Sequence, residues 1–323
     1  MRYRTVGHSG LKVSAVSLGS WLTFGNTVGD GAARDCIHAA LDAGVNFLDT
    51  ADVYATGEAE LSLGRLLPKL PRRELVIATK VFGAMSEGVT DRGLSRKHII
   101  DSCHDSLRRL HIDRIDLYQC HRYDEDTPLE ETVRAMSDLI AQGKVHYWGV
   151  SCWSPEQIRA AVAIAKETSG RAPISNQPCY NLLERDIEAE VIPCSQQQGL
   201  SQVIFSPLAQ GILTGKYLDG AVPAGSRLAN EDTNHFMKRS LTAKNDVRVR
   251  ALGELAAELH TTLAQLSLAW CLRLDNVASV ITGATRLAQV QENLAAVALE
   301  LDQATLDRIE SITTTRRPTL ESG

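Results

Sequence analysis

The chain has 323 residues, an apolar fraction of 44% and a formal net charge of −5 at pH 7. This length suits either two domains or one large α/β barrel, and the apolar fraction is sufficient for an extensive core. Basic and acidic residues are interspersed without a basic stripe, which argues against a nucleic-acid partner. The first residues lack the apolar core of a signal peptide, and no apolar run approaches about 18 residues. We therefore expect a cytoplasmic protein that does not insert into a membrane.

The first elements predicted are a hairpin and a strand. A short run at 3–6 and a His8-Ser9-Gly10 turn lead into the segment 11–21, in which 16–20 is the expected strand. After Gly29-Asp30-Gly31, apolar residues at helical spacing predict a helix over 32–43, which stops at Gly44.

Strands and helices then alternate along the rest of the chain. The further strands are expected at 45–49, 75–80, 115–121, 145–151, 174–180, 202–206 and 278–283. The helices are expected near 58–67, 95–110, 127–142, 154–168, 187–198, 246–259 and 263–272, with two more from Arg286 and from about Gln303. The segments Thr127-Pro128-Leu129-Glu130 and Ser154-Pro155-Glu156-Gln157 each match a capping box with proline at the first helical position.

Eight such units can close into a barrel or spread into an open doubly wound sheet. An open nucleotide-binding sheet usually carries G-x-G-x-x-G after its first strand, and the chain has no such run. The sequence therefore favours an α/β fold, a (β/α)8 TIM barrel with an N-terminal β-hairpin and extra helices, as a single domain over 1–323. The irregular stretch from 208 to about 243 is too long for a simple connection, so we expect it to be functional.

The seven cysteines are scattered and form no C-x-x-C pair, which argues against disulfides and zinc. We expect buried free thiols and no metal site, with Cys152 the one to watch because it lies beside a proposed cofactor contact.

Polar side chains close three successive predicted strands. These are Asp49, Lys80 and His121, and Tyr54 follows Asp49 by five residues. The C-terminal ends of neighbouring parallel strands converge on one site, so the four side chains are expected to meet there. A Lys80 ammonium held by Asp49 is expected to lower the pKa of Tyr54, so that the phenol can protonate an oxygen gaining negative charge.

His121 would orient the incoming carbonyl at that site. No side chain can donate hydride, so the site needs a nicotinamide cofactor. Each of the four residues alone has an ordinary structural explanation, such as a surface ion pair or a cap. Their joint placement predicts carbonyl reduction.

These four residues resemble the catalytic tetrad of the aldo-keto reductases. The resemblance runs from the N-terminal hairpin to about Ile312 and includes Leu48-Asp49-Thr50-Ala51, Gly93-Leu94-Ser95-Arg96-Lys97, Ser206-Pro207-Leu208-Ala209 and Gly283-Ala284-Thr285. Residues 127–136 and 213–217 are particularly similar to the branch that holds the voltage-gated potassium channel β subunits and their bacterial reductase relatives. The resemblance implies NADPH (NADP+ when oxidised) as cofactor, a small carbonyl substrate and, in many relatives, a homo-oligomer.

The resemblance also implies the cofactor contacts. Ser151 and Gln177, with Asn176 beside it, would meet the nicotinamide carboxamide, and Phe205 would stack on the ring. Ser20 would approach the cofactor and Trp21 would line the substrate pocket beside it. The remaining contacts follow the last two barrel strands: Ser206, Leu208, Gln210, Lys216, Arg227, Gly283, Thr285, Arg286, Gln289, Glu292 and Asn293. Independently, barrel enzymes often bind phosphate between the loops after strands seven and eight, at a helix N-terminus.

Two departures from the family pattern bear on function. Cys152 stands where the wider family often has asparagine and the channel branch arginine, which puts one cofactor contact in doubt. His121 stands where channel subunits carry asparagine, which favours a working reductase. Two alternatives stay open: an NADP(H)-binding redox-sensing or channel-associated regulatory subunit with little turnover, and a barrel with neither cofactor nor activity. The physiological substrate and the preference between NADPH and NADH cannot be predicted from the sequence.

Overall fold

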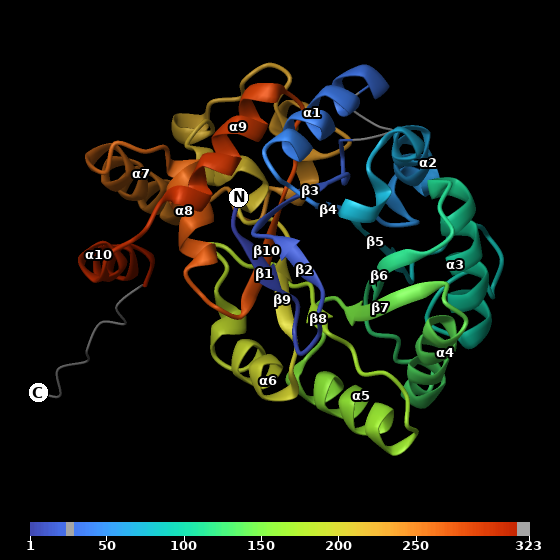
Figure 1. Cartoon of the computed structure of the whole chain (residues 1–323). Coiled ribbons are helices and arrows are strands. Elements are labelled where there is room, and N and C mark those ends of the chain that lie inside the picture. Colours follow the sequence, from blue (N-terminus) through green and yellow to red (C-terminus); the bar gives the residue numbers. More distant parts are fainter. Residues whose placement is uncertain (24–28, 315–323) are drawn as a thin grey trace, which may run out of the picture.

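Eight parallel strands close into a barrel, with helices arranged in a ring outside it (Figure 1). This computed structural model describes residues 1–23 and 29–314. Around the barrel the strands follow the order β10-β3-β4-β5-β6-β7-β8-β9. Their bounds are β3 Val16–Gly19, β4 Phe47–Asp49, β5 Val76–Val81, β6 Ile115–Cys120, β7 Val145–Val150, β8 Ser175–Asn176, β9 Ser201–Ile204 and β10 Val277–Thr282. The predicted (β/α)8 barrel is confirmed.

The helices that follow the strands cover the outside of the barrel. Their bounds are α1 Asp30–Asp42, α2 Glu58–Leu66, α3 Arg96–Leu110, α4 Leu129–Ala141, α5 Pro155–Glu167, α6 Val191–Gln198, α8 Leu263–Leu272 and α9 Leu287–Ala295. Two further helices, α7 (Ala243–Glu258) and α10 (Gln303–Thr313), pack against each other, and α7 also packs against α8, outside the ring (Figure 1). These are the extra helices that the sequence predicts.

The N-terminal hairpin closes one end of the barrel. Strands β1 (Tyr3–Thr5) and β2 (Lys12–Ser14) pair antiparallel and lie across the centre of the strand ring in Figure 1. The hairpin residues Val6 and Val13 share one buried apolar cluster with the interior barrel residues Phe47, Leu117 and Val203. Because the hairpin covers the N-terminal end of the strands, a site inside the barrel opens at their C-terminal end.

Two predicted elements differ most from the structure in length. The strand predicted over 174–180 forms a regular ladder only at Ser175–Asn176, since Pro178 has no N–H to donate; pairing resumes at the bridge between Cys179 and Phe205. The helix predicted over 187–198 begins at Val191. Pro193 is tolerated only in the first turn of a helix, and a start at Val191 places it there.

Of the two predicted capping boxes, one is confirmed and one is wrong. The Ser154 hydroxyl accepts from the Gln157 N–H at 3.3 Å, and the Gln157 side chain accepts from the Ser154 N–H at 2.9 Å. The helix predicted from Thr127 instead begins at Leu129 without a side-chain cap. The Thr127 hydroxyl donates instead to the Asp124 carboxylate at 2.7 Å, so it is not available to cap the helix.

The described cysteines are all free thiols, and most of them are buried as expected, whereas Cys152 is exposed. Within residues 1–23 and 29–314, no helix is both long and apolar enough to cross a membrane.

Candidate active site

Polar side chains replace apolar ones in the interior layer near the C-terminal ends of three adjacent strands. Side chains of a strand alternate between its two faces, so residues two apart share the barrel interior. One interior layer is apolar and consists of Phe47, Ala78 and Leu117. The residues two positions further along β4, β5 and β6 are Asp49, Lys80 and Gln119, which are all buried. The two-residue period of the strands therefore places Asp49, Lys80 and Gln119 in the barrel interior, on the C-terminal side of the apolar layer.

The Lys80 ammonium contacts two of the other predicted residues, Asp49 and Tyr54. Its Nζ atom lies 2.6 Å from Asp49 Oδ2, 3.2 Å from the Tyr54 hydroxyl and 2.7 Å from the carbonyl oxygen of Thr50. The Lys80 side chain has no exposed surface. A buried ammonium is costly unless it is paired, and these three oxygens provide the pairing.

Two glutamines hold the other oxygen of the Asp49 carboxylate. Gln177 Nε2 donates to Asp49 Oδ1 at 3.0 Å, and Gln119 Nε2 donates to the same atom at 3.3 Å. Gln119 is not among the residues predicted from the sequence. The strand period could have identified Gln119, because it lies two residues before His121 and therefore faces the same side of the strand. In the structure it pairs in register with Lys80.

Tyr54 lies in a short turn that follows β4 and precedes α2. The two residues after it, Ala55 and Thr56, both have positive φ angles, 49° and 51°. Left-handed backbone is costly for residues with a Cβ atom, and for a β-branched threonine above all. Further non-glycine residues with positive φ follow other barrel strands: Leu22, Cys152, Ser206, Ala209 and Gln210. Such strain gathers at functional sites, and here it gathers at the C-terminal mouth of the barrel.

The pKa of Tyr54 differs from the expectation. Burial raises it above the ordinary value for a phenol, and the Lys80 ammonium offsets only part of that rise. The predicted effect of Lys80 has the right sign, but the expected net lowering is wrong because the loss of solvent outweighs the neighbouring charge. Tyr54 is therefore fully protonated at neutral pH.

Lys80 and His121 respond to the same surroundings in opposite ways. Burial is the largest influence on the pKa of Lys80 and lowers it, but the Asp49 carboxylate and the Tyr54 hydroxyl together outweigh burial, so the net pKa is raised and Lys80 stays charged. Burial and the Lys80 charge lower the pKa of His121 to about 2, so its ring is neutral. The His121 and Tyr54 rings meet edge to face with centroids 5.7 Å apart. The structure thus brings all four predicted residues together.

A second set of buried ionisable residues lies beside the tetrad, and sequence reasoning missed it. Asp52 has no exposed surface and accepts from the Ser102 hydroxyl at 2.9 Å. Glu60, equally buried, accepts from Thr79 at 2.5 Å and from Arg109 Nε at 2.7 Å. Burial and the charge of Glu60 raise the pKa of Asp52 to about 7. Both acids lie close to the tetrad along the chain. Asp52 begins the turn that carries Tyr54, and Glu60 holds Thr79, the residue before Lys80.

The residues predicted to meet nicotinamide lie around the ends of β3, β7 and β8. Ser20 donates to the Thr50 hydroxyl at 2.8 Å, and Ser151 donates to the carbonyl oxygen of Gln177 at 2.8 Å. The Nδ2 atom of Asn176 is buried without a hydrogen-bond partner among the described residues. A buried donor without a partner costs free energy, so this position is suited to an acceptor supplied by a ligand. Phe205, half-buried, forms a parallel bridge with Cys179, which follows β8 along the chain.

The loop after β9 brings several more predicted residues together. Gln210 donates to the Ser206 hydroxyl at 2.5 Å and accepts from Arg227. The Arg227 guanidinium lies 5.2 Å from the centroid of the ring of Trp21, which follows β3, two strands around the barrel from β9. Leu208 on this loop is half-buried, and Lys216 is exposed near Gly211. The long loop is therefore folded against the end of β3.

The remaining predicted residues surround the N-terminus of α9, beside that loop because β9 and β10 are neighbours. Gln289 accepts from both the N–H and the hydroxyl of Thr285, and Arg286 is the N-terminal flanking residue without a side-chain cap. The helix start thus keeps N–H groups for an anion. Gly283 and Arg286 are exposed, Glu292 is half-buried and Asn293 is buried.

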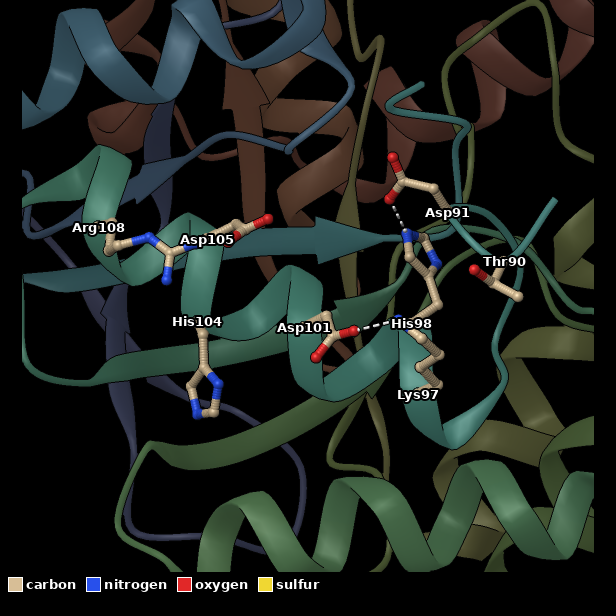
Figure 2. Close-up of a pocket in the computed structure, with 8 residues that line it drawn as sticks. All are labelled: Thr90, Asp91, Lys97, His98, Asp101, His104, Asp105 and Arg108. Carbon is tan, nitrogen blue, oxygen red and sulfur yellow. Dashed lines mark hydrogen bonds and ion pairs between the residues drawn. The ribbon is translucent and has the colours of Figure 1, made fainter. Parts of the chain in front are cut away.

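The outer face of α3 carries a separate pocket of about 340 Å³ (Figure 2). Its charged groups are largely paired, with Lys97 bonded to Asp101 and Arg108 to Asp105, so it resembles a solvated helix face. In the part of the chain that the structure describes, no cluster of acidic, histidine or cysteine side chains could hold a metal ion. The candidate active site is therefore the barrel mouth.

Comparisons with known proteins show which family the chain resembles. The model of the Aldo/keto reductase family matches residues 15–314. The chain is 45% identical to an Arabidopsis thaliana protein named "Probable voltage-gated potassium channel subunit beta", with 97% of this chain and 96% of the relative aligned. It is 43% identical to a protein of the same name from Oryza sativa subsp. japonica, with 100% and 99% aligned.

Proposed function

The chain belongs to the aldo/keto reductase family, and from that premise we propose that it reduces a small aldehyde or ketone to the alcohol with NADPH, using Tyr54 as the proton donor. The family makes the chain an oxidoreductase. The observation that carries the finer proposal is the bridge that Lys80 Nζ forms between Asp49 and Tyr54, at 2.6 and 3.2 Å, inside the barrel mouth.

Tyr54 is suited to give a proton to a strongly basic oxygen. The raised pKa keeps the phenol protonated in the resting site. A carbonyl oxygen that becomes an alkoxide is a stronger base than phenolate, so the transfer stays favourable. The phenolate that remains then faces the Lys80 ammonium at 3.2 Å, which stabilises the new charge without rearrangement.

Neutral His121 would position the substrate. With its pKa near 2 the ring carries one N–H, which can donate to a carbonyl oxygen but does not compete as an acid. Asp49, held by Gln119 and Gln177, keeps Lys80 charged and in place. Tyr54, Lys80 and His121 thus divide proton donation, charge stabilisation and orientation among them.

The site fits NADPH, which would supply the hydride that no side chain can give. Ser151, Asn176 and Gln177 would hold the carboxamide, and the unpartnered Nδ2 atom of Asn176 supports this role. Phe205 offers a ring for stacking. Lys216, Arg227 and Arg286 would hold the phosphates near the N-terminus of α9, where helix N–H groups favour anions. The other contacts retained in the proposal are Ser20, Trp21, Ser206, Leu208, Gln210, Gly283, Thr285, Gln289, Glu292 and Asn293.

Replacing Tyr54 tests the proposal. We expect Tyr54→Phe to lower NADPH-dependent turnover of an aldehyde by about 10²–10⁴-fold, the range for loss of a general acid. NADPH binding, followed by protein fluorescence quenching, should persist. Tyr118→Phe is the matched control, because its buried hydroxyl lies 3.4 Å from the Ile99 carbonyl, away from the tetrad. Undiminished turnover in Tyr54→Phe would contradict the assignment.

The names of the two relatives favour a second candidate function, a regulatory subunit of a potassium channel that binds NADP(H) with little turnover. Histidine at position 121, where channel subunits of the resembling branch carry asparagine, argues for turnover. Steady-state oxidation of NADPH over a panel of aldehydes separates the two. Co-purification with a channel subunit combined with negligible turnover would support the regulatory function.

We also propose that residues 1–323 form one domain. The barrel strands run from Val16 to Thr282, and the described helix α10 packs against α7. The predicted domain includes residues 24–28 and 315–323, which lie outside the described residues.

A further inference from the structure

Arg122 places a guanidinium at the mouth of the site. It directly follows His121 at the end of β6, and its Nη1 atom donates to the His121 carbonyl oxygen at 2.6 Å and lies 3.3 Å from Ser151 Oγ. The guanidinium therefore spans the ends of β6 and β7, between a tetrad residue and a proposed nicotinamide contact. The residue is exposed, so a ligand can reach it.

In the described part of the chain, the charge of Arg122 has no acidic partner. Among residues 1–23 and 29–314, no carboxylate forms an ion pair with it. Both of its protein contacts are neutral oxygens, a carbonyl and a hydroxyl. This differs from the arginines on the outer helices, such as Arg134, which is paired with Glu130 at 2.8 Å.

The charges around the reacting groups otherwise cancel. Lys80 and Asp49 form a buried pair at 2.6 Å, while Tyr54 and His121 are both neutral at pH 7. The Arg122 charge lowers the pKa of Tyr54 and of His121, so its field reaches both groups. The net charge of this set of five side chains is therefore about +1, and an anionic substituent on the substrate would neutralise it.

The donors that remain on Arg122 suit a planar anion. A guanidinium has five N–H groups, and among the described residues only Nη1 of Arg122 has hydrogen-bond partners. The edge formed by Nε and Nη2 can donate two parallel hydrogen bonds to a carboxylate. The cations proposed for the cofactor phosphates follow β9 and β10, whereas Arg122 follows β6, so the cofactor phosphates do not account for this charge.

We propose that Arg122 selects carbonyl substrates that bear a carboxylate, binding that group while the carbonyl lies between Tyr54 and His121. This inference rests on the reductase function proposed above. Arg122 acts in substrate binding and not in proton transfer, so its effect falls mainly on KM.

Three aldehydes of matched size test the inference: 4-carboxybenzaldehyde, its neutral methyl ester and the cationic 4-trimethylammonio-benzaldehyde. Steady-state NADPH oxidation is measured with the wild type, Arg122→Gln, Arg122→Lys and the control Arg134→Gln. Comparing the acid-to-ester ratio of kcat/KM between variants cancels the intrinsic reactivity of each aldehyde. Charge-assisted hydrogen bonds contribute enough to binding that we expect this ratio to fall about 10- to 100-fold in Arg122→Gln.

The other variants and substrates show whether the loss comes from the Arg122 guanidinium. Arg122→Lys, which keeps the charge but loses the planar fork, should retain part of the preference. The ester should change less than about 3-fold in Arg122→Gln, NADPH binding should be unchanged, and Arg134→Gln should match the wild type. A preserved acid-to-ester ratio in Arg122→Gln, or an equal loss for all three aldehydes, would overturn the inference. If the wild type reduces none of them, the reductase proposal fails instead.

Discussion

The buried carboxyl of Asp52 should make the stability of this protein depend on pH in an unusual direction. Its Oδ2 atom accepts from Ser102 at 2.9 Å and its Oδ1 atom from the Val53 N–H at 2.6 Å, with no exposed surface. Burial and the nearby Glu60 raise its pKa from 3.8 to about 7. Burial and the Glu60 charge outweigh the hydrogen bonds from Ser102 and Val53 and the Arg109 charge, so folding favours the protonated form of Asp52.

The sign follows from the protons bound in each state. Between pH 3.8 and about 7 the folded protein holds a proton on Asp52 that the unfolded chain has lost. The unfolding free energy therefore falls as pH rises through this window, by about 1.4 kcal/mol per pH unit, and levels off above the folded pKa. Over the whole window the contribution lost is about 4 kcal/mol.

The perturbation is Asp52→Asn, since an amide keeps the shape and the acceptor for Val53 N–H but cannot ionise. The gain in stability of the variant over the wild type should grow by roughly 2–3 kcal/mol between pH 5 and pH 7.5. For a chain of this size that corresponds to a relative rise in Tm of roughly 4 °C, measured by thermal unfolding across the pH series.

Asp302→Asn is the control for this series. Asp302 is exposed and caps α10, and its pKa is lowered by the hydrogen bonds from Thr305. It is ionised in both states over this range, so its variant should show a pH-independent difference from the wild type. An Asp52→Asn difference that is equally flat from pH 5 to 7.5 would refute the reasoning.

Three further substitutions test the packing and the helix caps. A Cβ atom at Gly64 in α2 would clash with the backbone carbonyl of Arg109, so Gly64→Ala should cost more than about 3 kcal/mol in denaturant unfolding. Gly253 in α7 has open space around it, so Gly253→Ala should instead gain about 0.5–1 kcal/mol, and equal effects would contradict the close approach of α2 and α3. Ser154→Ala should cost about 1 kcal/mol because it removes the capping box of α5, and a cost near zero would show that this cap does not stabilise the helix.

The sequence alone determined the order of the elements and the meeting of the tetrad. Both depend on local periods: apolar residues at helical spacing mark the helices, and strands that end in Asp49, Lys80 and His121 bring those side chains to one edge. Once eight strands run parallel, no long-range contact needs to be known to place their C-terminal ends together.

The tertiary structure decided what depends on burial and on partners distant in the sequence. The net pKa of Tyr54 is raised because packing removes more solvent stabilisation than Lys80 restores. The hold of Gln177 on Asp49 spans 128 positions, and no local pattern encodes it. Likewise Thr127 does not cap α4, because its hydroxyl donates to Asp124, whose carboxylate also accepts from the N–H of Leu94, 30 positions away in the sequence. Local periodicity fixes where side chains point, whereas their charge states and partners depend on which distant segments exclude water from them.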